Sequence, residues 1–347
     1  MTKNWKKITV IGLSAVACAL FVIVGFGLAY EGASHRVETR FDITTTINEA
    51  DLKPGKNPAS FQANGETIVG DLYLPADFAS GKTFPIVIVN PPASGVKEQT
   101  AGIYAQQMSQ RGFAAMAIDP RGFGGSGGQP LLLDAYRIAS DINASIAFLK
   151  GLQFSRKDEI YSLGICAGAG FAGLAAVSNS DIKAVGMVSP FLTSREDNYP
   201  GTVPRLLMRS AGGLARALNT QSTGQLVPTE PEAVDQASGI VKGMTGYYLP
   251  GMPGDTPSWR NALSIISVGP VSSFAIYDDA AELSTRPVTM VIGAEAVSRS
   301  GAERLHKQLS GPKEKLVLQD ADHFDLYYRE DYVVPASDQI ARFFVQH

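Results

Sequence analysis

The sequence predicts a doubly wound α/β fold, in which a mostly parallel sheet carries helices on both of its faces. Patterns typical of buried strands alternate with helical patterns over residues 85–188, and the alternation resumes after residue 286. Such alternation is typical of parallel strands joined by crossover helices. The 347 residues are 45% hydrophobic and 18% charged, a globular composition that excludes collagen, coiled coil and wholesale disorder.

The first thirty residues predict a transmembrane helix. Lys3, Lys6 and Lys7 precede residues 8–29, which carry no charged side chain. A helix of that length, at roughly 1.5 Å per residue, crosses the hydrocarbon core of a bilayer. The lysines are expected to remain cytoplasmic, which leaves the rest of the chain outside the cell membrane. The alternative is a cleaved signal peptide and a secreted protein, with residues 27–29 as a weak cleavage site.

The charge balance and the number of cysteines limit the classes of function that the protein can have. Thirty basic and 33 acidic residues give a net charge of −3, and the absence of a basic stripe argues against a nucleic-acid partner. Cys18 lies inside the apolar run, where it is a small apolar filler. Cys166 is then the only cysteine of the exported part. A thiol without a disulfide partner outside the cell must be either buried in the fold or functional.

The main domain is expected over residues 59–347, after a polar linker or loose first strand at 31–58. Strands at 59–63 and 67–74 flank Asn64-Gly65, a strong signal for a two-residue hairpin turn. Apolar runs predict further strands at 85–89, 113–118, 159–163, 184–188, 287–292 and 315–318, and periodic segments predict helices at 100–111, 134–149 (capped by Asp134), 167–177, 301–309 and 335–344.

An insertion at about 194–286 interrupts the sheet between two strands. It is rich in Gly, Pro and aromatic residues and shows no clear strand. Insertions of this size are usually folded caps over an active site. Tyr247, Tyr248, Trp259 and Phe274 are candidates to line a pocket beneath the cap, although ordinary cap core explains each of them equally well.

The segment Gly164-Ile-Cys-Ala-Gly168 lies between a predicted strand and a predicted helix. This pattern, a nucleophile between two glycines at a strand-to-helix turn, is a nucleophile elbow. The sharp turn needs small neighbours, which the glycines provide. The helix N-terminus favours an anion, so we expect a lowered pKa for Cys166. Burial as an apolar filler is the alternative for this cysteine.

A thiol nucleophile needs a base, and His323 is the candidate among the four histidines. It follows the last predicted strand, where this kind of fold supplies the base. Asp320, Asp322 and Asp325 surround it, but one histidine without a helical partner is poor support for a metal site.

The third member of a triad should be an acid between nucleophile and histidine in the chain. Glu295 is the only carboxylate in the turn after the predicted strand 287–292, although the usual position of the acid is one residue later, at Ala296. Asp278 and Asp279, which precede that strand, are the alternatives.

Two backbone N–H groups should form an oxyanion hole. One is expected from Ala167, directly after the nucleophile. The other is expected from the loop after strand 85–89, where Pro91 and Pro92 cannot donate, which leaves Ala93 or, less favoured, Ser94. The glycine-rich loop 119–128 lacks the Lys-Ser/Thr ending of a phosphate loop, and we expect tight packing beside the site instead.

These motifs resemble the α/β-hydrolases of the dienelactone hydrolase-like group. The resemblance extends from about Ala59 to Phe344 and rests on residues 95–100 (GVKEQT), 119–126 (DPRGFGGS), 164–168 (GICAG) and 321–327 (ADHFDLY). It implies an eight-stranded, mostly parallel sheet, a Cys-His-acid triad and no cofactor. The membrane anchor and the large insertion depart from soluble dienelactone hydrolases, so their lactone specificity does not carry over.

The expected function is therefore a membrane-anchored hydrolase that cleaves a small-molecule ester, lactone or thioester through an acyl-enzyme on Cys166. An acyltransferase or a peptidase could use the same machinery. A binding protein that kept the fold without the chemistry is the non-catalytic alternative.

Overall fold

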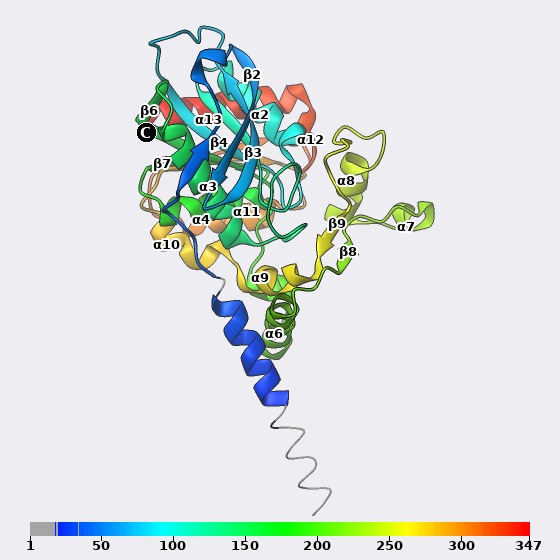
Figure 1. Cartoon of the computed structure of the whole chain (residues 1–347). Helices are drawn as coiled ribbons and strands as arrows, with labels where there is room; N and C mark the ends of the chain where they lie inside the picture. Colours follow the sequence, from blue (N-terminus) through cyan, green and yellow to red (C-terminus); the bar gives the residue numbers. More distant parts are fainter. Residues whose placement is uncertain (1–17, 19, 34) are drawn as a thin grey trace, which may run out of the picture.

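The computed structural model describes residue 18, residues 20–33 and residues 35–347. A nine-stranded sheet forms the centre of this part of the chain, in the order β1-β2-β3-β5-β4-β6-β7-β10-β11 (Figure 1). The strands are β1 (Ile43–Thr45), β2 (Gly55–Ala63), β3 (Glu66–Leu74), β4 (Phe84–Asn90), β5 (Ala114–Asp119), β6 (Ser155–Ile165), β7 (Ile182–Val188), β10 (Val288–Gly293) and β11 (Lys313–Leu318).

The mostly parallel sheet is confirmed. From β5 to β11 all neighbouring strands are parallel, whereas β1, β2 and β3 form an antiparallel edge. The expected hairpin is present, and Asn64 and Gly65 have φ of 51° and 83°, as a primed two-residue turn requires. The expected number of eight strands is wrong, because β1, in the segment 31–58 interpreted as a linker or a loose first strand, pairs with residues 61–63 of β2 and adds a ninth strand. β2 also begins at Gly55, earlier than the expected domain boundary at residue 59.

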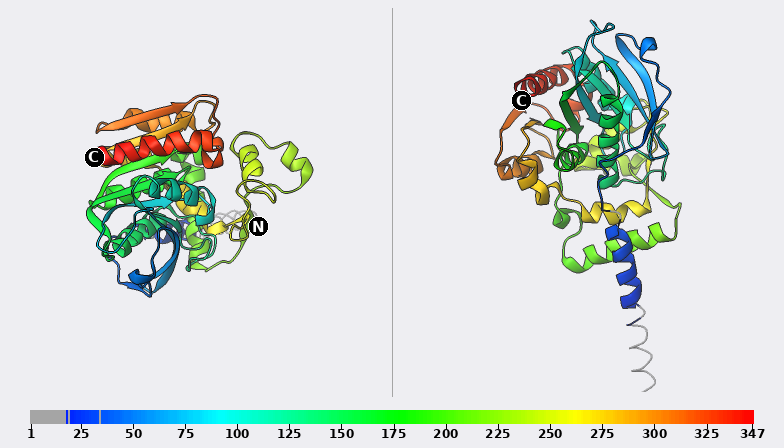
Figure 2. Two further views of the ribbon diagram at one scale, coloured as in Figure 1. Left: turned by 90° about the horizontal axis from the view of Figure 1, so that it is seen from above. Right: turned by 60° about the vertical axis from the view of Figure 1, so that its left-hand side comes forward.

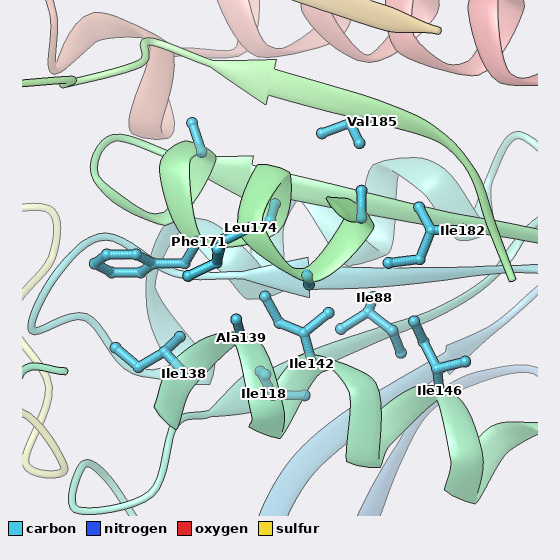
Figure 3. Packing of buried hydrophobic residues seen from close by; sticks show 14 of the residues in the cluster. Ile88, Ile118, Ile138, Ala139, Ile142, Ile146, Phe171, Leu174, Ile182 and Val185 are labelled. Atoms are coloured by element: carbon cyan, nitrogen blue, oxygen red, sulfur yellow. The ribbon is translucent and has the colours of Figure 1, made fainter. Parts of the chain in front are cut away.

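Helices cover both faces of the sheet. On one face lie α3 (Ala135–Lys150), α4 (Gly168–Ser178) and α11 (Arg299–Gln308), and on the other lie α2 (Gly102–Ser109) and α13 (Glu330–Gln346). Figure 3 shows the first layer, in which Ile138 and Ile142 of α3 lie below Phe171 and Leu174 of α4, and Ile146 lies further along α3 beside Ile88 and Ile182. Both faces are apolar because parallel strands must be buried on both sides.

Asp134 caps α3 as expected, since its carboxylate accepts the N–H groups of Tyr136 and Arg137.

The insertion lies between β7 and β10. It contains α5 (Arg195–Asn198), α6 (Thr202–Ala217), α7 (Pro231–Asp235), α8 (Gly239–Tyr248), α9 (Val268–Ser273) and α10 (Ala280–Leu283). It also contains a small antiparallel sheet of β8 (Thr223–Gln225) and β9 (Ala262–Ser264), which the sequence did not reveal because three residues are too short to show alternation. Figure 1 shows α7 and α8 beside the main sheet and α6 and α9 at its base.

A helix over residues 20–33 leads away from this base (Figure 1). It crosses α6 at glycines: a Cβ on Gly27 would lie 2.4 Å from the Ser210 carbonyl oxygen, and a Cβ on Gly213 would lie 1.9 Å from the Gly27 carbonyl oxygen. Within the described ranges no helix combines the length and apolar character needed to cross a bilayer. Half of the transmembrane helix expected over 8–29 falls outside these ranges, since residues 8–17 and 19 are not described.

Candidate active site

Cys166 occupies a sharp turn between β6 and α4. Its φ is +59°, a left-handed conformation that a non-glycine residue rarely adopts. Glycine is required at positions 164 and 168 because backbone atoms of neighbouring residues approach closely there. A Cβ on Gly164 would lie 2.2 Å from the Gly168 carbonyl oxygen, and a Cβ on Gly168 would lie 2.2 Å from the Pro91 carbonyl oxygen. The turn therefore holds the cysteine in one strained conformation at the carboxyl edge of the sheet.

The Cys166 side chain is nearly enclosed. The residue is 9% exposed, and burial raises the pKa of its thiol to about 11, although the hydrogen bond with Tyr327 and the Ala167 and Ala93 N–H groups counteract this rise. The lowered pKa that we expected from the helix N-terminus is therefore wrong, because desolvation of the charged sulfur outweighs the favourable dipoles. At neutral pH the resting side chain is a thiol rather than a thiolate.

The two expected oxyanion-hole residues converge on the sulfur. The N–H groups of Ala93 and Ala167 both act on Cys166 Sγ and favour its charged form. The loop that carries Ala93 is held from two sides, since the Lys97 N–H donates to Asp119 Oδ1 at 2.7 Å and Gln99 Nε2 donates to the Gly254 carbonyl at 2.6 Å. Donors fixed in this way can stabilise a negatively charged oxygen formed beside the sulfur.

His323 reaches the sulfur through Tyr327. The Tyr327 hydroxyl lies 3.1 Å from His323 Nε2 and also bonds to Cys166 Sγ. Tyr327 belongs to the short helix α12 (Asp325–Tyr328) and lies one helical turn after the histidine. Sequence reasoning missed this tyrosine, although its spacing of four residues from His323 would have allowed the two side chains to meet.

The other ring nitrogen of His323 faces two serines. Nδ1 lies 2.7 Å from Ser298 Oγ and 3.0 Å from Ser189 Oγ. The Ser189 hydroxyl donates its proton to the His323 carbonyl at 2.8 Å, so it can only accept at the ring. This arrangement places the ring proton on Nδ1 and leaves the lone pair of Nε2 directed at Tyr327.

The structure does not bring the expected acid to His323. The Glu295 side chain is exposed, and its backbone N–H bonds to the Ala321 carbonyl at 2.9 Å. Asp278 forms an ion pair with Arg195 instead, with 2.8 Å between Oδ2 and Nη2, and no hydrogen bond joins Asp279 to His323. Among the described residues no carboxylate bonds to the ring, and burial lowers the pKa of His323 to about 3.

Glu295 turns outward because the chain folds back at 293–296, where the Ala296 N–H bonds to the Gly293 carbonyl. The ring is met instead by Ser298, at the start of α11. Ser189 and Ser298 follow β7 and β10, and the carboxyl ends of neighbouring parallel strands share one edge of a sheet. This rule, applied to the sequence, could have identified both serines as neighbours of the ring. In the described part of the chain no cluster of His, Cys, Asp and Glu side chains could hold a metal ion.

Two pockets share the expected oxyanion-hole residues, Ala93 and Ala167, in their linings. The first, which we call the sulfur pocket, has a volume of about 560 Å³ including its mouth. The second, which we call the adjacent pocket, has a volume of about 690 Å³ measured in the same way. They share Ala93, Leu133, Ala167 and Phe191. The sulfur pocket is otherwise lined by Pro92, Ser94, Cys166, Leu226, Ile240, Met244, Tyr248, Leu263, Phe324 and Tyr327.

The four cap aromatics have different positions. Tyr248 lines the sulfur pocket, and Phe274 lines the adjacent pocket. Trp259 stacks on Tyr248, with 4.8 Å between ring centroids, and Tyr247 packs edge-on against Tyr327 at 4.9 Å. Two of the four therefore contact the pockets directly, and the other two support residues that do.

This fold and site define an α/β-hydrolase. The family described as serine aminopeptidase, S33, matches residues 97–239. The chain is 30% identical over 283 residues to the uncharacterized protein YcjY of Escherichia coli strain K12, covering 79% of this chain and 92% of that protein. It is 26% identical over 289 residues to the polyketide transferase claH of Penicillium crustosum, covering 80% of this chain and 94% of claH.

A solved structure supports the same assignment. The crystal structure of the hypothetical protein PA2218 from Pseudomonas aeruginosa superposes with a TM-score of 0.76 at 25% identity, over 88% of this chain and all of that one. The chain belongs to the α/β-hydrolase superfamily.

Proposed function

We propose that this protein cleaves an apolar carboxylic ester, lactone or thioester through an acyl-enzyme on Cys166. One observation carries the proposal: the sulfur receives two backbone N–H groups, from Ala93 and Ala167, and lines an apolar pocket. A nucleophile with an oxyanion hole beside it is the arrangement that acyl transfer needs.

The first half-reaction starts from neutral partners. The thiol gives its proton to the Tyr327 oxygen while the Tyr327 hydroxyl proton passes to Nε2 of His323, which the serines hold with its lone pair free. The sulfur attacks the substrate carbonyl carbon, and the carbonyl oxygen becomes an anion bound by the N–H groups of Ala93 and Ala167. Collapse of this intermediate breaks the bond to the leaving group, which takes the proton back from the histidine.

The second half-reaction releases the acyl group from the thioester. A water molecule gives a proton to the relay of Tyr327 and His323 and attacks the thioester carbonyl, and the sulfur leaves as a thiolate that regains a proton. No carboxylate of the described residues bonds to the imidazolium that forms transiently. The serines supply orientation without charge, so the imidazolium is less stable here than in a triad that contains an acid.

The lining of the sulfur pocket favours an apolar acyl group. Ile240, Met244, Leu263 and Phe324 belong to the cap or to the histidine loop, and the hydroxyl groups of the lining come from Ser94, Tyr248 and Tyr327. An uncharged acyl chain or ring would be desolvated there at little cost.

Acyl transfer to a second molecule is the alternative that a specific observation favours. The adjacent pocket meets the sulfur pocket at Ala93 and Ala167, so an acceptor could approach the thioester from that side. The relative claH is named as a polyketide transferase.

We also propose that residues 8–29 anchor the protein in the cell membrane with the catalytic domain on the outer side. The three preceding lysines and the uncharged run support this proposal. A secreted form after signal cleavage is the alternative.

The test is to trap the acyl-enzyme. The full chain is mixed with short-chain p-nitrophenyl esters and acyl thioesters, quenched in acid, and analysed by peptide mass spectrometry. We expect one acyl group on Cys166, none in Cys166→Ala, and faster loss of the acyl group when an alcohol or amine acceptor is added if the protein is a transferase. Cys18→Ala is the matched control, and it should acylate normally. No acyl group on Cys166 with any of these substrates would favour a non-catalytic binding protein.

A further inference from the structure

A basic pocket lies at the base of the molecule, away from Cys166. It has a volume of about 720 Å³ including its mouth. Arg195, Arg205 and Arg209 line it, together with His35, Tyr136, Thr202, Leu206, Ser272 and Ser273. No carboxylate is part of the lining, so the pocket presents guanidinium and hydroxyl groups, which are the groups that bind phosphate.

One of the three arginines has unused hydrogen-bonding capacity. Arg195 pairs with Asp278 and Arg205 pairs with Glu196 at the rim. Arg209 forms no ion pair with any described residue, and its buried Nε has no hydrogen-bond partner among them. A buried, unpartnered guanidinium nitrogen is costly unless a ligand satisfies it. The pocket therefore contains one guanidinium, on the partly exposed Arg209, that no described carboxylate pairs with, whereas His35 in its lining bonds to the buried Glu31 carboxylate at 3.0 Å.

Exposed apolar side chains lie on the helix that carries Leu206 of this pocket and on the helix that crosses it. On α6, Val203, Leu206 and Leu207 are exposed, and they lie three and four residues apart on one face of the helix. On the helix over 20–33, the exposed side chains are Leu20, Phe21, Val22, Ile23, Phe26 and Tyr30. Singly exposed apolar residues are ordinary, but a continuous group beside a basic pocket indicates contact with an amphiphile or a membrane.

The two helices are locked together at this base. The contacts of Gly27 with Ser210 and Gly213 leave no room for a side chain between them. Figure 2 (right) shows α6 running across the helix over 20–33, whose axis leads away from the body. If that helix continues into a bilayer, as we propose for residues 8–29, α6 lies along the membrane surface with the pocket at the level of the headgroups.

We propose that the basic pocket binds the phosphate of an anionic phospholipid, whose chains lie against the exposed apolar faces of α6 and the helix over 20–33. Arg209 would supply the unpaired guanidinium. Ser272 and Ser273 line the same cavity, but their hydroxyl groups both donate to the Gly269 carbonyl, at 2.7 and 2.9 Å, and so add no free donor. The inference depends on the proposed membrane anchor for its orientation, but not on the proposed chemistry of Cys166. Bound lipid would hold the cap against the membrane, because α6 is part of the cap.

Lipid binding is tested on the full chain in a neutral detergent. Native mass spectrometry counts the molecules retained when phosphatidylglycerol, phosphatidylcholine or inorganic phosphate is added. We expect retention of one phosphatidylglycerol in preference to phosphatidylcholine, and a loss of about tenfold in affinity in Arg209→Gln. Arg156→Gln, in which a surface arginine that pairs with Glu159 is changed, is the matched control and should bind like the wild type.

The outcomes separate the two proposals. Equal retention of the two lipids, or unchanged binding by a folded Arg209→Gln with normal thermal stability, would overturn the lipid site. Inorganic phosphate that binds as tightly as phosphatidylglycerol would also overturn it, because the apolar faces would then contribute nothing. Flotation of the full chain with phosphatidylcholine vesicles tests the anchor alone. A chain that fails to float but still retains phosphatidylglycerol in detergent would contradict the anchor and leave the lipid site supported.

Discussion

The two halves of the candidate site are built in different ways. The sulfur half, Gly164 to Gly168, is one continuous turn whose shape follows from close backbone approaches. The imidazole half combines His323 and Tyr327 with two serines that end other strands. A contiguous turn depends on its own residue types, whereas a constellation drawn from separate segments depends on the packing of the whole sheet. Substitutions in the sulfur half should therefore lower the stability of the fold. Substitutions in the imidazole half should mainly lower the catalytic activity.

Removal of the base is expected to have the largest effect. His323→Gln keeps a polar side chain in the buried position but cannot accept and return a proton as imidazole does. We expect kcat/KM for a p-nitrophenyl ester to fall by about 10³- to 10⁴-fold. His306→Gln, on α11, is the control. A variant that keeps more than a tenth of the activity would remove His323 from the mechanism.

Gly168→Ala is expected to disrupt the sulfur half by lowering the stability of the fold. The new Cβ would lie 2.2 Å from the Pro91 carbonyl oxygen and 2.7 Å from Asn90 Nδ2, so the backbone of the elbow must move. We expect the free energy of unfolding in urea to fall by about 3 kcal/mol. Gly246→Ala is the matched control, because nothing lies within 4 Å of its Cβ position and alanine favours a helix. Equal stability of the two variants would contradict the tight turn.

Tyr327→Phe separates the relay from the scaffold. It removes only the hydroxyl that joins His323 Nε2 to Cys166, so thermal stability should change little. Without the bridge we expect kcat to fall by about 10²-fold while KM stays similar. Tyr104→Phe, which removes the buried hydroxyl that donates to the Leu326 carbonyl at 2.8 Å, controls for loss of a buried hydrogen bond. Similar kcat values for the two variants would mean that the histidine acts on the thiol directly.

Because no described carboxylate bonds to His323, we expect an unusual dependence of kcat/KM on pH. With the pKa of His323 near 3 and that of Cys166 near 11, both groups are neutral between these limits, so kcat/KM should be flat from about pH 5 to 8. Ser298→Asp would place a carboxylate at Nδ1, favour the protonated ring and raise its pKa. The ratio of activity at pH 5 to that at pH 8 should then fall about tenfold.

Ser298→Ala is the uncharged control for this profile and should keep the wild-type ratio. An acid limb near pH 6.5 in the wild type would show that the ring is less desolvated than its burial indicates, and the contrast between the two halves would weaken.

Prediction from sequence succeeded where the signal was local. Sequence patterns predicted the hairpin at Asn64-Gly65 and the cap at Asp134. They also predicted that the central strands are mostly parallel. It left β1 undecided between a linker and a loose first strand, because three residues show no alternation, and it failed at the pKa of Cys166, because burial cannot be read from the residues that flank the turn. It failed again at Glu295, since the direction of a loop side chain depends on how the loop folds back.

The sequence alone determined the strand-and-helix alternation and the strained turn at Cys166, because both arise from periodicity and steric size within a few adjacent residues. Only the tertiary structure decided that Tyr327 bridges the sulfur and the imidazole, and that Ser189 and Ser298 face the ring where an acid was expected. The physical reason is that these contacts join residues from separate segments, whose distances and desolvation are set by the packed sheet.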